Sequence, residues 1–184
     1  MNIPYDMSTK FNDDLKDEAV NPEDMKKGIA FLKEKLEEAK DDLELAKIYN
    51  MIGIYQRILS NFEDAEVSFS QAHTIFTNLK ETVLLEGVNL RMAIMYQQMG
   101  DYNKSDSIFT RIIKEIEQNQ NKALEHYHDF VLQHYGKSLF DQKRYQKALD
   151  LFLRAHAMRL LKGDVNLIQS TELAIKKTKE KLGV

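Results

Sequence analysis

The 184-residue sequence contains no cysteine and no tryptophan, and its only prolines are Pro4 and Pro22. Without cysteine, disulfides, thiolate metal sites and cysteine nucleophiles are excluded. Because proline interrupts helices, the chain after Pro22 is free of that kind of break. No apolar run reaches the roughly 18 residues of a membrane span, and the first 20 residues are too polar and acidic for a secretory signal. We therefore expect a cytoplasmic protein with no membrane partner.

The seven glycines are scattered along the chain, so no glycine-rich phosphate-binding loop is present. Charge is uneven: the net charge is −6 over residues 1–44, −2 over 45–121 and +5 over 122–184. The basic C-terminal region would attract an acidic partner, or its lysines are simply solvated helix faces, and both interpretations stay open. Since no Arg/Lys cluster alternates with aromatic residues, we expect no nucleic-acid binding.

Capping residues and apolar spacing predict eight helices and no strand. Asn21, Pro22 and the acidic residues after them are typical of a helix start, and Asn61, Asp101 and Asp164 are further candidate caps. The predicted order is a leading helix over 21–40, helix pairs over about 42–78, 80–119 and 121–162, and a capping helix over 164–182. In the capping helix, Leu167, Ile168, Leu173, Ile175 and Leu182 would cover the third pair. Residues 1–20 are predicted to form a mobile or loosely docked arm.

The three pairs share one spacing of residue types. The series are Gly53, Phe62, Ala65, Phe69, Ala72; Ala93, Tyr102, Ser105, Phe109, Ile112; and Gly136, Tyr145, Ala148, Phe152, Ala155, and the second member recurs after 40 and then 43 residues. A small residue in one helix, an aromatic residue opening the next, and a small then a large residue inside it indicate a helix–turn–helix unit. Such a unit buries its apolar face only by stacking on its neighbours.

These residues resemble the tetratricopeptide repeat, over roughly residues 42–162, in its long-helix variety. The resemblance implies a single all-α domain over 21–184, a right-handed α-α superhelix that binds a protein or a short peptide and is not an enzyme. It implies no cofactor and no metal, and the oligomeric state, homo-oligomers included, is left open. Two alternative functions stay open: the sensing part of a bacterial peptide-responsive regulator, and a secretion or assembly chaperone.

In that family the first helix of each pair lines the concave face, at positions two, five, nine and twelve of the repeat. Carried onto this sequence, the predicted peptide-binding residues are Lys47, Asn50, Ile54, Arg57, Leu90, Ile94, Gln97, Gln133, Lys137 and Phe140. Asn50, Gln97 and Gln133 suit the hydrogen-bonding groups of an extended peptide, because an amide side chain both donates and accepts. The apolar members offer pockets, and Arg57 and Lys137 offer contacts to anions.

A metal-dependent enzyme is the remaining alternative, and it depends on the acidic and histidine residues between Glu125 and His134. On one continuous helix, His126 and His128 would lie on opposite sides, and His128 and His134 would lie about 120° apart. Neither pair has the spacing of four residues found in helical zinc motifs. The sequence therefore favours histidines packed between helices or exposed on the surface.

Overall fold

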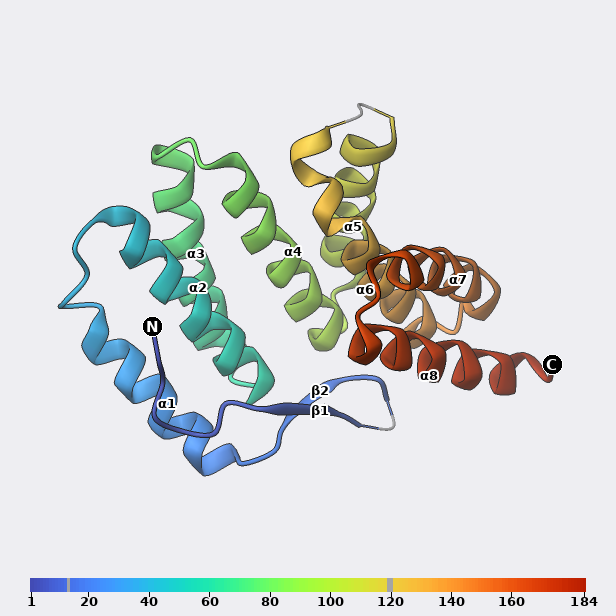
Figure 1. Cartoon of the computed structure of the whole chain (residues 1–184), viewed down its shortest axis with the longest axis horizontal. Coiled ribbons are helices and arrows are strands. Elements are labelled where there is room, and N and C mark those ends of the chain that lie inside the picture. The colour runs from blue at the N-terminus through green and yellow to red at the C-terminus, as the bar shows by residue number, and fades with distance from the viewer. Residues whose placement is uncertain (13, 119–120) are drawn as a thin grey trace. The chain divides into compact units, whose positions relative to one another are not determined.

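The computed structural model describes residues 1–12, 14–118 and 121–184. This part of the chain contains eight α-helices, one 3-10 helix and two short antiparallel strands, so the predicted all-α class is confirmed (Figure 1). The elements are β1 (Thr9–Phe11), β2 (Asp17–Ala19), α1 (Pro22–Lys35), α2 (Asp42–Ile58), α3 (Phe62–Asn78), α4 (Thr82–Met99), α5 (Tyr102–Glu117), η1 (Lys122–Tyr127), α6 (His128–Asp141), α7 (Tyr145–Lys162) and α8 (Val165–Leu182).

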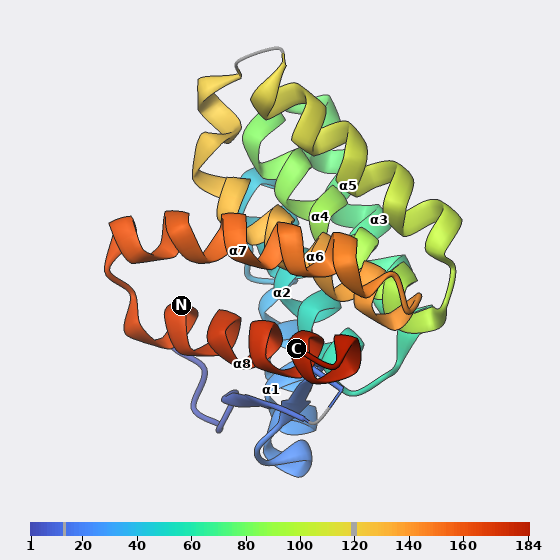
Figure 2. The same ribbon diagram turned by 90° about the vertical axis from the view of Figure 1, so that its right-hand side faces the viewer.

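The chain forms two compact units, Met1–Met95 and Tyr96–Val184, and the division falls inside α4. In each unit, helices pack on their neighbours in sequence, as expected of a solenoid: α1 on α2 and α2 on α3 in the first, and α5 on α6, α6 on α7 and α7 on α8 in the second (Figures 1 and 2). That residues 21–184 act as one domain stays a prediction.

Close approach within a pair requires a small residue at the predicted register position. A Cβ added at Gly53 would lie 2.7 Å from the ring of Phe69, and one added at Gly136 would lie 2.6 Å from the ring of Phe152. Both phenylalanines are fully buried, as are Ala65, Ala72, Ala148 and Ala155 in the same helices, α3 and α7. The register read from the sequence is therefore the register in which α2 packs on α3 and α6 packs on α7.

The turn inside each pair is also repeated. Ser60, Gly100 and Lys143 occupy equivalent positions, and all three have positive φ, at 61°, 80° and 60°. At each turn the next backbone N–H reaches five residues back, as in the bonds from Asn61 to Gln56 and from Arg144 to Leu139. This is the Schellman ending, which satisfies the last carbonyls of a helix and favours glycine at the left-handed residue.

We expect Lys143→Gly to raise the free energy of unfolding by about 0.5–1 kcal/mol, because Lys143 is exposed and the left-handed conformation costs a residue with a Cβ about 1–2 kcal/mol. Urea unfolding monitored by circular dichroism measures the change. Gly100→Ala, at the same position of the second pair, serves as the reverse control and should destabilise. A Lys143→Gly variant less stable than wild type would contradict this account of the turn.

Some elements differ from the sequence prediction. The strands were not predicted, and they form a hairpin within the segment predicted to be an arm. The first helix of the third pair, predicted to begin at residue 121, is instead η1 followed by α6. Asn61 makes no side-chain cap bond, whereas Asp101 at the equivalent turn does. The end predicted for the second pair, residue 119, lies outside the described residues.

The fully buried residues of the capping helix α8 are small: Thr171, Ala174 and Thr178. Of the apolar residues predicted to cover the third pair, Leu173 is exposed, and Leu167, Ile168, Ile175 and Leu182 are partly buried. Small side chains let two helices approach closely, so this face suits the contact between α7 and α8 (Figure 2). Of the described helices, including α8, none combines the length and apolarity needed to cross a bilayer.

Candidate peptide-binding surface

The ten predicted ligand-contacting residues divide between the two units and differ in exposure. Lys47 is exposed, and Asn50, Ile54 and Phe140 are partly buried. The other six are buried: Arg57, Leu90, Ile94, Gln97, Gln133 and Lys137. Leu90 and Ile94 of α4 are buried as residues of the hydrophobic core also are. Their assignment as ligand contacts therefore stays a prediction.

In the first unit, the predicted residues of α2 follow one stripe at steps of three and four residues, from Lys47 to Arg57. Arg57 is only 5% exposed, and its Nη2 donates a hydrogen bond of 3.0 Å to Oδ2 of Asp17 in β2. Two turns earlier on the same stripe, Oδ1 of Asn50 is buried and has no hydrogen-bond partner among the described residues. This stripe thus combines Arg57, whose cation binds a carboxylate, with Asn50, whose Oδ1 is an acceptor without a partner among the described residues.

In the second unit, polar residues follow α6 at steps of four: Asp129, Gln133, Lys137 and Asp141. The first three are buried, and Oδ2 of Asp141 accepts a 2.7 Å hydrogen bond from Nε2 of Gln97. Gln97 stands at the repeat position of Arg57, so in the first and second repeats the residue at this position binds an aspartate. Asp17 and Asp141 were not among the predicted residues.

Gln133 is the least expected of these side chains. It is 2% exposed, and among the described residues neither its Nε2 nor its Oε1 has a hydrogen-bond partner. A buried amide without partners costs about 1–3 kcal/mol, so such groups are rare in folded proteins. Gln133 also stands at the repeat position of Asn50. Two equivalent positions therefore hold amides with hydrogen-bonding capacity that the described protein leaves unused.

Asp129 at the start of α6 has a structural role. Its Oδ2 accepts a 2.9 Å hydrogen bond from Nε of Arg159 in α7, and its other oxygen binds Lys162. Arg159 is 2% exposed and also donates a 2.8 Å hydrogen bond to Oγ1 of Thr171 in α8. Burial alone would raise the pKa of Asp129, but the bonds from Lys162 and Arg159 outweigh it and lower that pKa. This cluster joins three helices.

The histidines considered for metal-dependent chemistry each contact a different residue. Nε2 of His128 and Oε1 of Glu117 form a hydrogen bond of 2.8 Å, and Glu117 also binds Arg154. His126 contacts the ring of Tyr127, and His134 contacts that of Phe130. Among the residues that the structure describes, no three histidine or carboxylate side chains are grouped as metal ligands. The absence of a metal stays a prediction.

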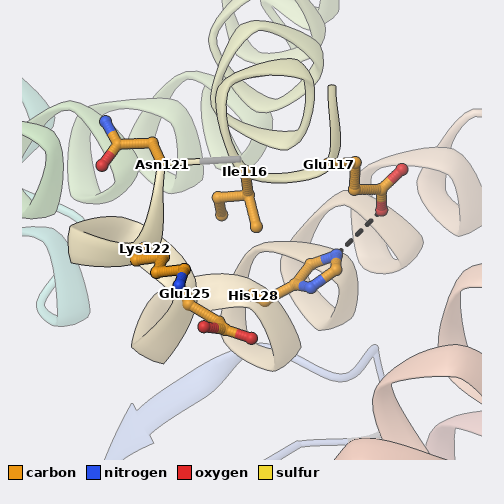
Figure 3. Close-up of a pocket in the computed structure, with 6 residues that line it drawn as sticks. All are labelled: Ile116, Glu117, Asn121, Lys122, Glu125 and His128. Carbon is orange, nitrogen blue, oxygen red and sulfur yellow. Dashed lines mark hydrogen bonds and ion pairs between the residues drawn. The ribbon is translucent and has the colours of Figure 1, made fainter. Parts of the chain in front are cut away.

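A cavity of about 290 Å³ adjoins this region, lined by Ile116, Glu117, Asn121, Lys122, Glu125 and His128 (Figure 3). Burial would raise the pKa of Glu117, and the bond from His128 and the charge of Arg154 reverse this and lower it. The carboxylate is therefore held as an ionised partner of two basic groups. An acid held in this way is a poor general base, because its ionised form is stabilised.

Comparison with models of protein families and with curated proteins gives no match to this chain.

The sequence prediction did not include Asp17 and Asp141, the hydrogen-bond partners of Arg57 and Gln97. Asp141 lies four residues after Lys137 on the same side of α6, so extending the stripe by one turn would have included it. Asp17 carries no comparable signal, because it lies in an acidic segment 40 residues from Arg57. Its pairing depends on how the hairpin docks, which no local pattern encodes.

Proposed function

We propose that this chain is a non-enzymatic binding module of tetratricopeptide-like repeats, and that its ligand is a protein or peptide segment in extended conformation. The proposed binding residues are those of the predicted stripes on α2, α4 and α6. Its proposed compartment is the cytoplasm. The repeated register of small and aromatic residues supports the repeat architecture, since Gly53 with Phe69 and Gly136 with Phe152 make the same close contact.

One observation carries the proposal. Asn50 and Gln133 occupy the same position in the first and third repeats, and both have buried polar atoms with no hydrogen-bond partner among the described residues. An extended peptide presents a backbone N–H and a C=O at every residue other than proline, and an amide side chain can bind both. Such a ligand would supply the missing partners and offset the cost of burying the amides.

The neighbouring side chains on the stripes suit the same kind of ligand. Ile54 and Phe140 are partly buried and offer apolar contacts, and Arg57 offers a cation that already binds a carboxylate. Extended peptides are commonly recognised through their backbone for affinity and through alternate side chains for specificity. A surface that combines amides, apolar side chains and a cation meets both requirements.

We expect bait carrying Asn50→Ala and Gln133→Ala to lose the partner that wild-type bait captures from an extract of the source cells. The matched control is Asn103→Ala with Gln146→Ala, two exposed residues on the second helices of their pairs. Quantitative mass spectrometry compares the three baits. Retention of every partner by the Asn50/Gln133 variant would contradict the proposal.

Stability separates a binding role from a structural one. Because an unpaired buried amide costs free energy, replacing it with alanine removes that cost, and the variant should unfold at about the same urea concentration as wild type. Loss of the partner together with a large loss of stability would instead mean that the two amides support the fold.

A further inference from the structure

Arg57 lies on the predicted stripe of α2, and it forms an ion pair with a residue of a strand rather than of a helix. The Nη2 atom of Arg57 and Oδ2 of Asp17 are 3.0 Å apart, and Asp17 is the first residue of β2. The guanidinium is 5% exposed and the carboxylate 20% exposed. A charge-assisted hydrogen bond at this depth is stronger than one at the surface, since water competes less for it.

Residues that precede Asp17 pack against the first unit's helices or lie buried next to them. Leu15 is almost fully buried in the turn that precedes β2, and β2 contacts α2. Met7 packs so closely on α1 that a Cβ added at Gly28 would lie 2.2 Å from its sulfur, and Ile3 packs against the core of α1 and α2. Among the described residues of the first 20, Ile3, Met7 and Leu15 thus make apolar contacts and Asp17 pairs with Arg57. That this segment is a mobile or loosely docked arm stays a prediction.

The same stripe has a second position that an extended chain could reach. Asn50 and Arg57 are seven residues apart on α2, a distance of about 10 Å along the helix axis. An extended chain covers that distance in about three residues. A ligand whose carboxylate binds Arg57 could therefore donate a backbone N–H to the unpaired Oδ1 of Asn50.

We propose that Arg57 is the carboxylate-binding subsite of this stripe and that Asp17 occupies it as an intramolecular ligand. The partner then carries an aspartate or glutamate in an extended segment, and its carboxylate replaces that of Asp17 on Arg57. Residues 1–20 thereby set a threshold for binding, because a tethered carboxylate competes at an effective concentration in the millimolar range. This inference deepens the proposed peptide-binding function and rests on it.

The first test measures how the arm is held, in the full chain. Amide hydrogen exchange of residues 14–20 should be faster in Arg57→Gln and in Asp17→Asn than in wild type, by about tenfold, which corresponds to losing the net strength of one charge-assisted bond. Lys47→Gln, an exposed cation on the same stripe, is the matched control and should leave exchange unchanged. The exchanged pair Asp17→Arg with Arg57→Asp should restore protection. Unchanged exchange in both single variants would overturn the inference.

The second test identifies the ligand chemistry with a fluorescent peptide of the sequence of residues 14–20. It should bind the full-length Asp17→Asn chain at least about tenfold more tightly than wild type, because the internal competitor is weakened. A peptide carrying Asp17→Asn should bind that chain at least about tenfold more weakly, and Arg57→Gln should abolish the difference between the two peptides.

Equal binding of the two peptides by the Asp17→Asn chain, or no binding of either, would overturn the inference. Circular dichroism of each variant verifies that the chain is folded. The result stays distinct from that of the partner capture, which alters Asn50 and Gln133 and leaves Asp17 and Arg57 in place. Suppose that the Asn50/Gln133 variant loses the partner and that hydrogen exchange of residues 14–20 is the same in all variants. The proposed function would then stand, and only this inference would be overturned.

Discussion

Asp129→Ala is expected to lower the free energy of unfolding by about 3–5 kcal/mol, the largest effect of any substitution considered for this protein. Asp129 is the acidic partner of Arg159 in α7, which is 2% exposed and also bonds to Thr171 of α8. Removing the carboxylate leaves a buried cation without its counter-ion, and the desolvation cost of that cation is no longer offset. Urea unfolding at pH 7 measures the loss.

Two controls distinguish this explanation from a general intolerance of the region. Glu117→Ala removes an acid that binds Arg154 at a partly exposed site, and such a pair contributes about 0–1 kcal/mol. Asp129→Ala combined with Arg159→Met removes both buried charges and should recover part of the lost stability. If the double variant is as unstable as the sum of the single variants, the ion pair is not the cause.

The same pair makes stability depend on pH in a defined direction. The pKa of Asp129 is lowered from its ordinary value of 3.8, so the folded state favours the ionised carboxylate. Its contribution is fully present above 3.8 and is lost as the pH falls through the lower pKa of the folded state. The difference in unfolding free energy between wild type and Asp129→Asn should therefore be constant near neutral pH and shrink in acid.

Gly136→Ala is expected to lower the free energy of unfolding by about 1–3 kcal/mol, although alanine favours a helix more than glycine does. The added Cβ would lie 2.6 Å and 2.8 Å from two ring carbons of Phe152, which is fully buried. Gly53→Ala should behave in the same way, since its Cβ would lie 2.7 Å from the ring of Phe69. Thermal and urea unfolding measure both.

A compensating substitution tests whether the ring is the obstacle. Phe152→Leu should destabilise the wild-type chain by leaving a cavity, and it should be less harmful in the Gly136→Ala background, where the smaller side chain makes space for the new methyl group. Strict additivity of the two changes would show that Gly136 is needed for another reason, and the shared register of the first and third pairs would lose its physical basis.

The helical part of the fold was predictable because its signals are local and repeated. Small residues at Gly53 and Gly136 and the phenylalanines 16 residues later define the packing of each pair without reference to distant parts of the chain. Asn21, Asp101 and Asp164 cap the helices that they were expected to cap, since each side chain accepts from the backbone N–H three residues on. The hairpin had no such signal, because its strands are only three residues long.

The candidate site was predictable only in outline. The repeat positions identified Arg57, Gln97 and Gln133, and sequence spacing could not say which of them bind partners within the protein. Arg57 binds Asp17, Gln97 binds Asp141, and Gln133 has no hydrogen-bond partner among the described residues. These differences arise from tertiary contacts between segments 40 or more residues apart, and they separate structural polar groups from those with unused capacity.

The most direct test of the binding surface is the dissociation constant of the captured partner for four chains: wild type, Asn50→Ala, Gln133→Ala and the double variant. If the ligand bonds to each amide, each single change should weaken binding by about 0.5–1.5 kcal/mol and the double change by about the sum, at unchanged stability. Asn103→Ala with Gln146→Ala should leave affinity at the wild-type value. Equal affinity of wild type and the Asn50/Gln133 double variant would contradict the account.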